Sequence, residues 1–193
     1  MTRFYMIRHG QTDENKAKHI QGRRDIPLNS FGEAQARMCG NFLKKYKFDM
    51  AFCSPLSRAK RTLEIILEEL GSNLNIIPDE RFIERSFGVM EGALITEENF
   101  RPIIAETSSG LELSKDIQKR VCDALIDIAI KNPNKDILVV SHSHTIKAVT
   151  TAVDKKYRFD DKLYNCALTI INVENKDINI LDFNIKTIDW YRI

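Results

Sequence analysis

Residues 4–12 read Phe-Tyr-Met-Ile-Arg-His-Gly-Gln-Thr, a short apolar run that passes directly into a polar cluster. The run over 4–7 is typical of a buried strand. Arg8, His9 and Gly10 then stand at the carboxyl end of that strand. Sheets of parallel strands flanked by helices bind ligands beyond the carboxyl ends of the strands. This stretch therefore predicts both a strand of the sheet and a candidate ligand site at the end of that strand.

Two further apolar runs end in the same way. A strand predicted over 50–53 is followed by Ser54 and, one turn later, by Arg58. The continuous aliphatic run over 137–140, typical of a strand covered on both faces, leads into Ser-His-Ser-His at residues 141–144. Because the carboxyl ends of parallel neighbours meet at one edge of a sheet, we expect two arginines and two or three histidines to converge there.

Helical patterns separate these strands. Ser30 and Glu33 form a capping-box pattern, which predicts a helix from Ser30 to about Tyr46. Helices are also predicted over 56–70, 113–130 and 146–153, and strands over 74–77, 167–173 and 178–183, the last two as a hairpin. The alternation predicts an α/β fold, a three-layer α/β/α sandwich around a mostly parallel central sheet. We expect residues 1–193 to form a single domain.

Charge and composition limit the classes of partner and the compartment that the sequence allows. The 29 Lys and Arg nearly balance the 27 Asp and Glu, which argues against nucleic acid or an anionic membrane as the main partner. No run approaches the roughly 20 apolar residues of a membrane span, and the first ten residues lack the apolar stretch of a signal peptide. The four cysteines form no C-x-x-C pair. We expect a cytoplasmic protein with a small-molecule partner, and the sequence leaves its oligomeric state open.

Two arginines that converge on one point suit a dianion. The guanidinium fork matches phosphate oxygens, and its charge is fixed at any useful pH. A histidine between them can accept a phosphoryl group on one ring nitrogen if the other donates its proton to a fixed acceptor. Gly10 permits close backbone approach beneath the ring of His9. The residues thus predict phosphoryl chemistry at His9.

Five ordered blocks carry a resemblance to a known family. Arg8-His9-Gly10-Gln11-Thr12 is similar to the R-H-G-x-T signature of the histidine phosphatase superfamily, the phosphoglycerate mutase-like proteins. The four later blocks follow in the family's order, and the match spans roughly residues 3 to 173. They are Asn15 with Gln21-Gly22-Arg23, Ser54 to Ala59 with Thr62, Glu84 to Gly92, and Val139 to His142, and a late Asn165 comes after them. The chain most resembles the phosphatase branch, such as α-ribazole phosphatase and broad-specificity members.

The resemblance implies a role for each catalytic residue. His9 would attack phosphorus and become phosphohistidine. Arg8, Arg58 and His142 would hold the phosphoryl oxygens. Glu84 would protonate the leaving oxygen and then activate water. The resemblance also implies that the reaction needs no metal, and we expect the phosphatase to use no cofactor.

Four more residues are candidates for binding phosphate. The resemblance implies Asn15, Gln21 and Gly22, and the backbone N–H of Ser143 can serve although family members often have glycine there. His144 also departs from the family pattern. We expect it to line the pocket or to cap the next helix.

The segment after the acidic block is short, because only 27 residues separate Gly92 from Arg120. Mutases of this family typically carry a longer insertion there. A short lid over about 93–112 favours water access and therefore hydrolysis of small phosphomonoesters. A cofactor-dependent phosphoglycerate mutase is the alternative. Three arginines near the lid are candidates for a second anionic group of the substrate: Arg81, Arg85 and Arg101.

Two other hypotheses come from the same residues. His142-x-His144 after a buried strand is also a possible opening of a metal site, which would indicate a metallohydrolase. A non-catalytic phosphate-binding or interaction domain could use the same fold. The sequence does not identify the physiological substrate.

Overall fold

One mixed sheet of six strands forms the centre of the computed structural model, which describes residues 1–188. The strand order is β3-β2-β4-β1-β5-β6. The first four are parallel to one another, and β5 and β6 add an antiparallel hairpin beside β1. The predicted mostly parallel sheet with a late hairpin is therefore confirmed. The strands span Thr2–Arg8 (β1), Met50–Cys53 (β2), Ile76–Pro78 (β3), Asp136–Ser141 (β4), Leu168–Glu174 (β5) and Asp177–Ile185 (β6).

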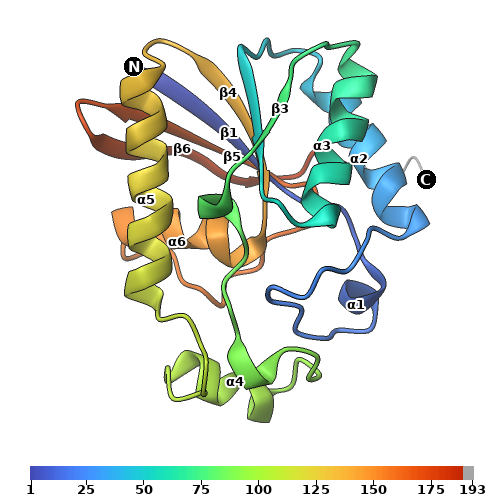
Figure 1. Cartoon of the computed structure of the whole chain (residues 1–193), viewed down its shortest axis with the longest axis vertical. Helices are drawn as coiled ribbons and strands as arrows, with labels where there is room; N and C mark the ends of the chain where they lie inside the picture. The colour runs from blue at the N-terminus through green and yellow to red at the C-terminus, as the bar shows by residue number, and fades with distance from the viewer. Residues whose placement is uncertain (189–193) are drawn as a thin grey trace.

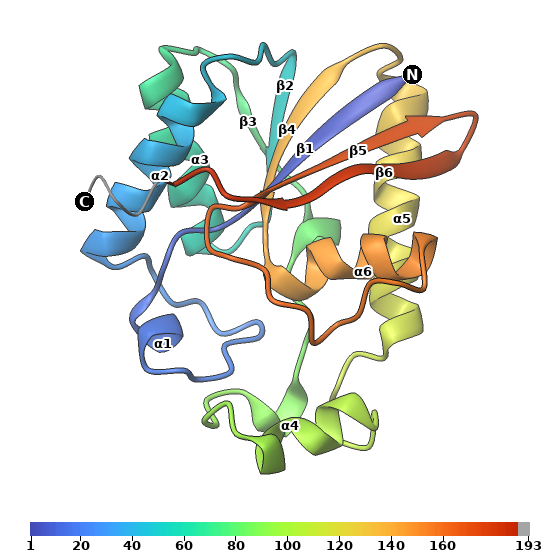
Figure 2. The same cartoon turned by 180° about the vertical axis from the view of Figure 1, so that it is seen from behind.

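Helices cover both faces of this sheet, α2 and α3 on one and α5 and α6 on the other (Figures 1 and 2). Side chains alternate along β1, so that Phe4 and Met6 pack into the core under α5 and α6, and Tyr5 and Ile7 into the core under α2 and α3. The predicted three-layer sandwich is confirmed. The helices span Asp13–Lys16 (α1), Ser30–Leu43 (α2), Ser57–Leu70 (α3), Glu97–Ile104 (α4), Ser114–Lys131 (α5) and Ser143–Val153 (α6), with short 3₁₀ turns at Glu80–Phe82 and Gly88–Met90.

Because of the register of the sheet, the carboxyl ends of β1, β2 and β4 lie side by side. Ile7 on β1 and Cys53 on β2 both pair with Val140 on β4. Immediately beyond, the His9 N–H donates to the Ser141 carbonyl oxygen at 2.9 Å. The polar clusters that follow these strands are therefore neighbours at one edge.

The predicted capping box at Ser30 is wrong by one residue. Asn29 is the N-cap of α2, and its side-chain oxygen accepts the Gly32 N–H at 2.8 Å. The Asn29 amide also donates to the side chains of Gln11 and Asp13, both at 3.1 Å. These contacts with the loop after β1 fix Asn29 as the cap and leave Ser30 in the first helical turn.

Two other boundaries differ from the prediction for identifiable reasons. Helix α6 begins at Ser143 and not at Ile146, because the Glu84 carboxylate accepts the N–H groups of His144 and Thr145 in its first turn. Strand β3 includes Pro78, which was expected to end it. Because β3 is an edge strand, the missing N–H of proline removes no bond from the ladder.

The lid segment, residues 93–112, lies beyond the carboxyl ends of the parallel strands, at the bottom of Figure 1. It contains α4, for which no element was predicted. Ile103 on α4 packs with Ile20 and Phe87 in a small apolar cluster separate from the two main cores. The lid is therefore attached by its own cluster and not by the sheet.

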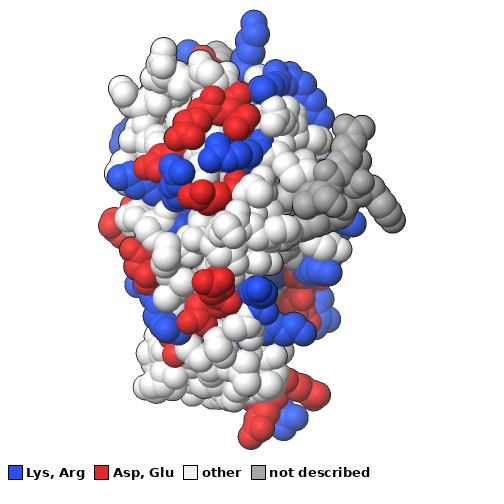
Figure 3. Space-filling model, turned by 90° about the vertical axis from the view of Figure 1, so that its right-hand side faces the viewer, with Lys and Arg blue, Asp and Glu red and all other residues white. Residues whose placement is uncertain are grey.

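The surface carries mixed charge. Figure 3 shows basic and acidic side chains interspersed over one face, in keeping with the net charge of +2. Within the described part of the chain, no helix has the length and apolar character to cross a membrane.

Candidate active site

His9 lies one residue beyond β1 and is 3% exposed. Its Nδ1 stands 2.7 Å from the Gly10 carbonyl oxygen, which can only accept, so Nδ1 carries the ring proton. Nε2 is then the nitrogen with the lone pair, and the Arg58 Nε–H donates to it over 3.3 Å. Burial, Arg58 and Arg8 hold the pKa of His9 well below its ordinary value. The ring is therefore neutral at neutral pH, with its lone pair on Nε2.

Two glycines let the loop after β1 pass against α2. A Cβ on Gly10 would stand 2.4 Å from the Gly32 carbonyl oxygen, and a Cβ on Gly32 would stand 2.1 Å from the Gln11 oxygen. The Gly10 N–H donates to Thr62 Oγ1 on α3 at 3.0 Å. The backbone directly after His9 is therefore fixed against α2 and α3, which holds the ring in place.

Arg8 and Arg58 lie beside this ring, and among residues 1–188 no carboxylate pairs with either. Arg58, 1% exposed in the first turn of α3, donates to the carbonyl oxygens of Gly22 and Arg24, both at 2.8 Å. Arg8 donates to the Leu163 carbonyl oxygen, and its Nε–H has no partner among residues 1–188. Burial lowers the pKa of both guanidinium groups, that of Arg58 to about 10. Both stay cationic at neutral pH.

His142 is the N-cap residue of α6 and is fully buried, with its ring centroid 5.1 Å from that of His9. Its Nε2 lies 2.7 Å from Ser54 Oγ. That oxygen already accepts the Leu56 N–H at 3.3 Å, so its own proton is available to Nε2. Nδ1 then carries a hydrogen and has no partner in the described chain. It is an unused donor next to the lone pair of His9.

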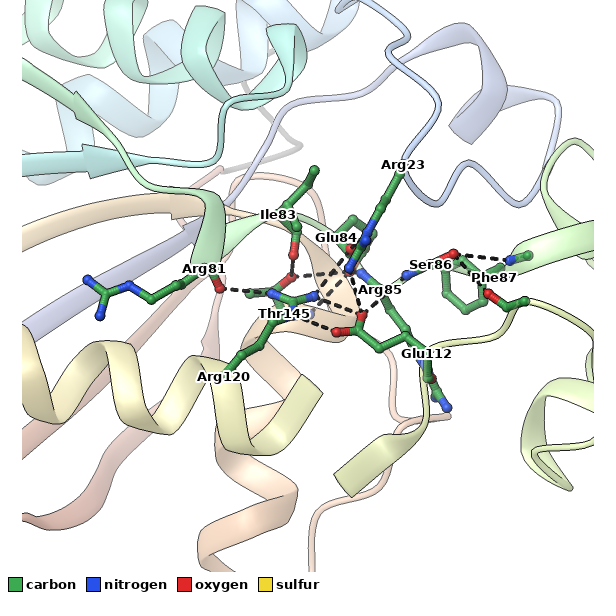
Figure 4. A network of polar contacts seen from close by, with 12 residues as sticks. Arg23, Arg81, Ile83, Glu84, Arg85, Ser86, Phe87, Glu112, Arg120 and Thr145 are labelled. Carbon is green, nitrogen blue, oxygen red and sulfur yellow. Dashed lines mark hydrogen bonds and ion pairs between the residues drawn. The ribbon is translucent and has the colours of Figure 1, made fainter. Parts of the chain in front are cut away.

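Glu84 stands at the N-terminus of α6, where Figure 4 shows it beside Thr145. Its Oε1 accepts the Arg85 N–H at 2.9 Å and the Thr145 N–H at 3.2 Å, and its Oε2 accepts the His144 N–H at 3.4 Å. These bonds fix Glu84 on the wall of the cavity that contains His9.

The segment that carries Glu84 is clamped to α5 (Figure 4). Arg120 donates to both oxygens of the Glu112 carboxylate, at 2.6 and 2.9 Å, and to the Arg81 carbonyl oxygen at 2.8 Å. Arg23 adds a bond to the Glu84 carbonyl oxygen at 3.2 Å. The position of the Glu84 carboxylate therefore depends on residues far away in the sequence.

A cavity of about 620 Å³ opens at this edge of the sheet. Eight of the nine predicted site residues line it, namely Arg8, His9, Asn15, Gln21, Gly22, Arg58, Glu84 and Ser143. The ninth, His142, is fully buried beside His9. The structure thus brings the whole predicted set together.

The three residues implied only by resemblance hold their places through local bonds. Asn15 Oδ1 accepts the Thr12 N–H at 3.2 Å and an amide hydrogen of Asn165 at 3.3 Å, which leaves the Asn15 NH₂ group as a donor. Gln21 accepts the Thr12 hydroxyl at 3.0 Å. Gly22 contributes through its carbonyl oxygen, which binds Arg58.

Glu91, close to Glu84 in the sequence, has a structural position. Its Oε1 accepts the N–H groups of Arg23 and Phe87, both at 3.1 Å. A Cβ on Gly22, whose φ is +57°, would stand 2.1 Å from that oxygen. Glu91 therefore binds two loops together beneath the cavity wall.

His144 lines the pocket, as one of its two expected positions required, but neither the aromatic rings around it nor a buried lysine was predicted. His144 lines the cavity, stacked on Phe159 at 5.2 Å between ring centroids and edge-on to Phe87 at 4.9 Å. Phe100 and Lys147 line it as well. A helix that starts at Ser143 places its side chains 143, 144 and 147 on one face. The late predicted start at 146 concealed this face.

The arginines proposed for a second anionic group do not reach this cavity. Arg81 is paired with Asp79 at 2.6 Å, Arg85 is paired with Glu106 at 2.9 Å, and the side chain of Arg101 is 77% exposed. None of them lines the cavity. That expectation is wrong, because Arg81 and Arg85 already form ion pairs with nearby carboxylates and Arg101 lies outside the cavity lining.

The proposed metal-site opening at His142 and His144 lacks a ligand set. The two rings face different partners, Ser54 Oγ and the Phe159 ring. Among residues 1–188, no group of three or more His, Cys, Asp or Glu side chains is arranged to hold a metal ion. The residues present therefore do not fit a metal centre of the kind that a hydrolase uses.

A neutral histidine beside two arginines that have no carboxylate partner within residues 1–188, at the carboxyl edge of an α/β sheet, defines a class of protein that handles phosphoryl groups. The particular family follows from comparison with known proteins. The chain belongs to the histidine phosphatase superfamily (branch 1), whose family model matches residues 4–186.

Individual relatives include both phosphatases and mutases. The chain is 35% identical to the uncharacterized phosphatase PhoE of Bacillus subtilis, over 97% of this chain and 96% of that protein. It is 30% identical to a 2,3-bisphosphoglycerate-dependent phosphoglycerate mutase of Cytophaga hutchinsonii, over 78% of this chain and 76% of that one. A mutant phosphoserine phosphatase of Entamoeba histolytica, solved in complex with phosphoserine, has 26% identity and a TM-score of 0.82 over 95% of this chain and 97% of that chain.

Proposed function

We propose that the chain is a metal-independent phosphatase that hydrolyses small phosphomonoesters through a phosphohistidine on His9. The observation that carries the proposal is the state of His9, which is neutral, has its proton fixed on Nδ1 by Gly10, and presents Nε2 between Arg8 and Arg58. A neutral imidazole with a fixed tautomer is a nucleophile at neutral pH. Two cations that lack carboxylate partners stabilise the charge of a phosphoryl group.

The first step transfers the phosphoryl group to the enzyme. His9 Nε2 forms a bond to phosphorus as the bond between phosphorus and the ester oxygen breaks. Arg58 exchanges its bond to Nε2 for one to a phosphoryl oxygen, and the free N–H of His142 binds another. Glu84, protonated on one oxygen, gives its proton to the leaving oxygen, so the alcohol departs neutral.

The second step returns the enzyme to its starting state. Glu84, now a carboxylate, takes a proton from water as the water oxygen attacks phosphorus. The bond between phosphorus and Nε2 breaks, and its electron pair returns to the imidazole. Inorganic phosphate leaves, so the two steps consume one water and one ester. The amide of Asn15 and the N–H of Ser143 would bind phosphoryl oxygens in both steps.

Hydrolysis is favoured over mutase chemistry by the lid. Leu94 and Ile95 are about half exposed, and Ile104 is 66% exposed. A mutase has to keep its phosphorylated intermediate in the site and exclude water. A short lid with exposed apolar side chains supports water as the acceptor. Mutase activity is the alternative outcome of the test below.

We place this activity in the cytoplasm, with a small phosphorylated molecule as the partner. All four cysteines are free thiols, as a reducing compartment maintains them. The net charge of +2 gives no support for nucleic acid or a membrane surface as a partner.

Phosphate release in the presence of EDTA tests the proposal directly. The panel contains p-nitrophenyl phosphate, 3-phosphoglycerate, glycerol 3-phosphate, phosphoserine and α-ribazole phosphate. We expect turnover in EDTA, and acid-labile, alkali-stable labelling of the protein when a ³²P substrate is quenched in alkali. Isomerisation of phosphoglycerate after priming with 2,3-bisphosphoglycerate, without phosphate release, would assign a mutase. Turnover that returns only when a metal is added would overturn the mechanism.

A further inference from the structure

Three buried cations line the cavity without a carboxylate partner. Arg8, Arg58 and Lys147 are each nearly fully buried or enclosed by the cavity wall, and among residues 1–188 none of them has a carboxylate oxygen within 4.0 Å. Buried charges in proteins are normally paired. In the proposed reaction the phosphoryl group pairs with the two arginines. Lys147 gains no anionic partner from that phosphoryl group.

Lys147 sits on α6 and is 6% exposed. Its Nζ donates to the Phe159 carbonyl oxygen at 2.9 Å, which is its single hydrogen bond in the described chain. That bond satisfies one of three ammonium hydrogens. The aromatic rings of His144 and Phe159 line the same part of the cavity. The remaining N–H groups are therefore available to a ligand.

The nearest charged groups do not neutralise Lys147. Arg8 on β1 repels it, and Glu84 attracts it from the loop before α4. Asp160 and Asp161, in the loop before β5, also attract it, but Asp160 is held by the Arg158 guanidinium at 2.8 and 3.0 Å. Asp161 accepts the Arg158 N–H at 2.7 Å. Burial and Arg8 together lower the pKa of Lys147 to about 8.

We propose that Lys147 binds a second anionic group of the substrate, a carboxylate, and so selects small phosphomonoesters that carry one. The inference rests on the proposed phosphatase function and names its substrate class. Ser143 and Lys147 are four residues apart on α6, which separates them by about 6 Å along the helix axis. A carboxylate a few bonds from the ester oxygen spans that distance. A single ammonium matches the single charge of a carboxylate better than a second phosphate dianion.

A matched pair of substrates isolates this contact. 3-Phosphoglycerate and glycerol 3-phosphate share their phosphate and carbon chain, and differ in a carboxylate against a hydroxymethyl group. We expect the wild-type enzyme to prefer 3-phosphoglycerate in kcat/KM by about 10- to 100-fold, as one charge-assisted hydrogen bond provides. Lys147→Gln should reduce that ratio about tenfold or more, and Lys147→Arg should retain most of it.

The pH dependence of the ratio adds a second readout. The preference should fall as pH rises from 7 to 9.5, because only the ammonium form binds a carboxylate. Titration of the phosphate group, which both substrates share, cancels in the ratio. Lys147→Arg should keep its preference at pH 9.5. Lys162→Gln is the matched control, since this exposed lysine lines the same cavity, and it should change the ratio less than about twofold.

Binding to an inactive variant separates this inference from the proposed function. In His9→Ala protein, calorimetry should show 3-phosphoglycerate binding about tenfold or more tighter than glycerol 3-phosphate, and Lys147→Gln should remove the difference. Equal affinities, or equal losses for both ligands in Lys147→Gln, would overturn the inference and leave Lys147 as an anchor for the loop at Phe159. Failure of phosphate release by wild-type protein, with the binding preference intact, would count against the phosphatase and support the subsite.

Discussion

At the phosphoryl end of the cavity, formed by Arg8, His9, Arg58 and His142, most of the side-chain surface is buried and each residue is held by hydrogen bonds. The lid end, residues 93–112, is instead a thin layer on a small apolar cluster, and several of its apolar side chains face solvent. The first end is continuous with the ends of β1 and β4, whereas the second packs on Ile20 and Phe87 and is bonded to the body by the Arg85–Glu106 ion pair. The residues proposed for the chemistry thus belong to the sheet and its adjoining helices, whereas the lid is a segment that can vary without disturbing them.

Replacing a histidine at each end should give the largest contrast. His9→Ala removes the proposed nucleophile, and we expect kcat to fall by about 10⁴-fold or more with loss of all acid-labile label. His19→Ala is the matched change toward the lid, where His19 bonds to Glu14 at 2.6 Å and pairs with Leu94. It should change kcat/KM less than about tenfold, because this residue only shapes the rim. Turnover by His9→Ala that matched His19→Ala would contradict the proposed mechanism.

Glu84 is the proposed proton donor to the leaving group. The loss of activity on replacing it should therefore depend on which group leaves. Glu84→Gln keeps the shape and removes the proton, and we expect kcat/KM for glycerol 3-phosphate to fall by about 10²–10⁴-fold. The loss for p-nitrophenyl phosphate should be much smaller, because p-nitrophenolate leaves without protonation. Steady-state kinetics on both esters checks this. Equal losses would show that Glu84 only supports the phosphate site.

The same contrast explains what the sequence could predict. The phosphoryl end was predictable because Arg8, His9 and His142 directly follow apolar strands, and parallel strands deliver their carboxyl ends to one edge. The lid helix and the aromatic wall were not. Ser143, His144 and Lys147 share one face of α6 because this helix begins at Ser143, three residues earlier than predicted. That start depends on Glu84, which comes from a distant segment. Long-range contacts of this kind leave no local pattern.

Two adjacent isoleucines on α4 test how weakly the lid is attached. Ile103 is 1% exposed and Ile104 is 66% exposed. Ile103→Ala should destabilise the lid by about 2–4 kcal/mol, because it removes buried methyl groups from a cluster of few residues. Hydrogen exchange followed by mass spectrometry should then speed up over 93–112 and stay unchanged over β1 and β4. Ile104→Ala is the control and should leave both regions unchanged. Faster exchange in β1 would show that the lid and the sheet unfold as one unit.

Mild acid should weaken the phosphoryl end and spare the lid, which contains no histidine. Burial holds the pKa values of His9, His142 and His144 well below the ordinary value of about 6.5. Below that pH the unfolded chain binds protons that the folded protein does not, so stability is full above about pH 7 and falls as the pH decreases. Each histidine contributes up to about 1.4 kcal/mol per pH unit.

Urea denaturation at pH 7.5, 6.5 and 5.5 measures this slope. His144→Phe keeps an aromatic ring between Phe87 and Phe159 and removes one of the three titrating groups. The slope between pH 6.5 and 5.5 should therefore fall by about one third. An unchanged slope in this variant would mean that His144 titrates normally in the folded protein, and that the cavity wall it forms is open to water. The expected decrease would show that the aromatic wall excludes water as strictly as the site around His9.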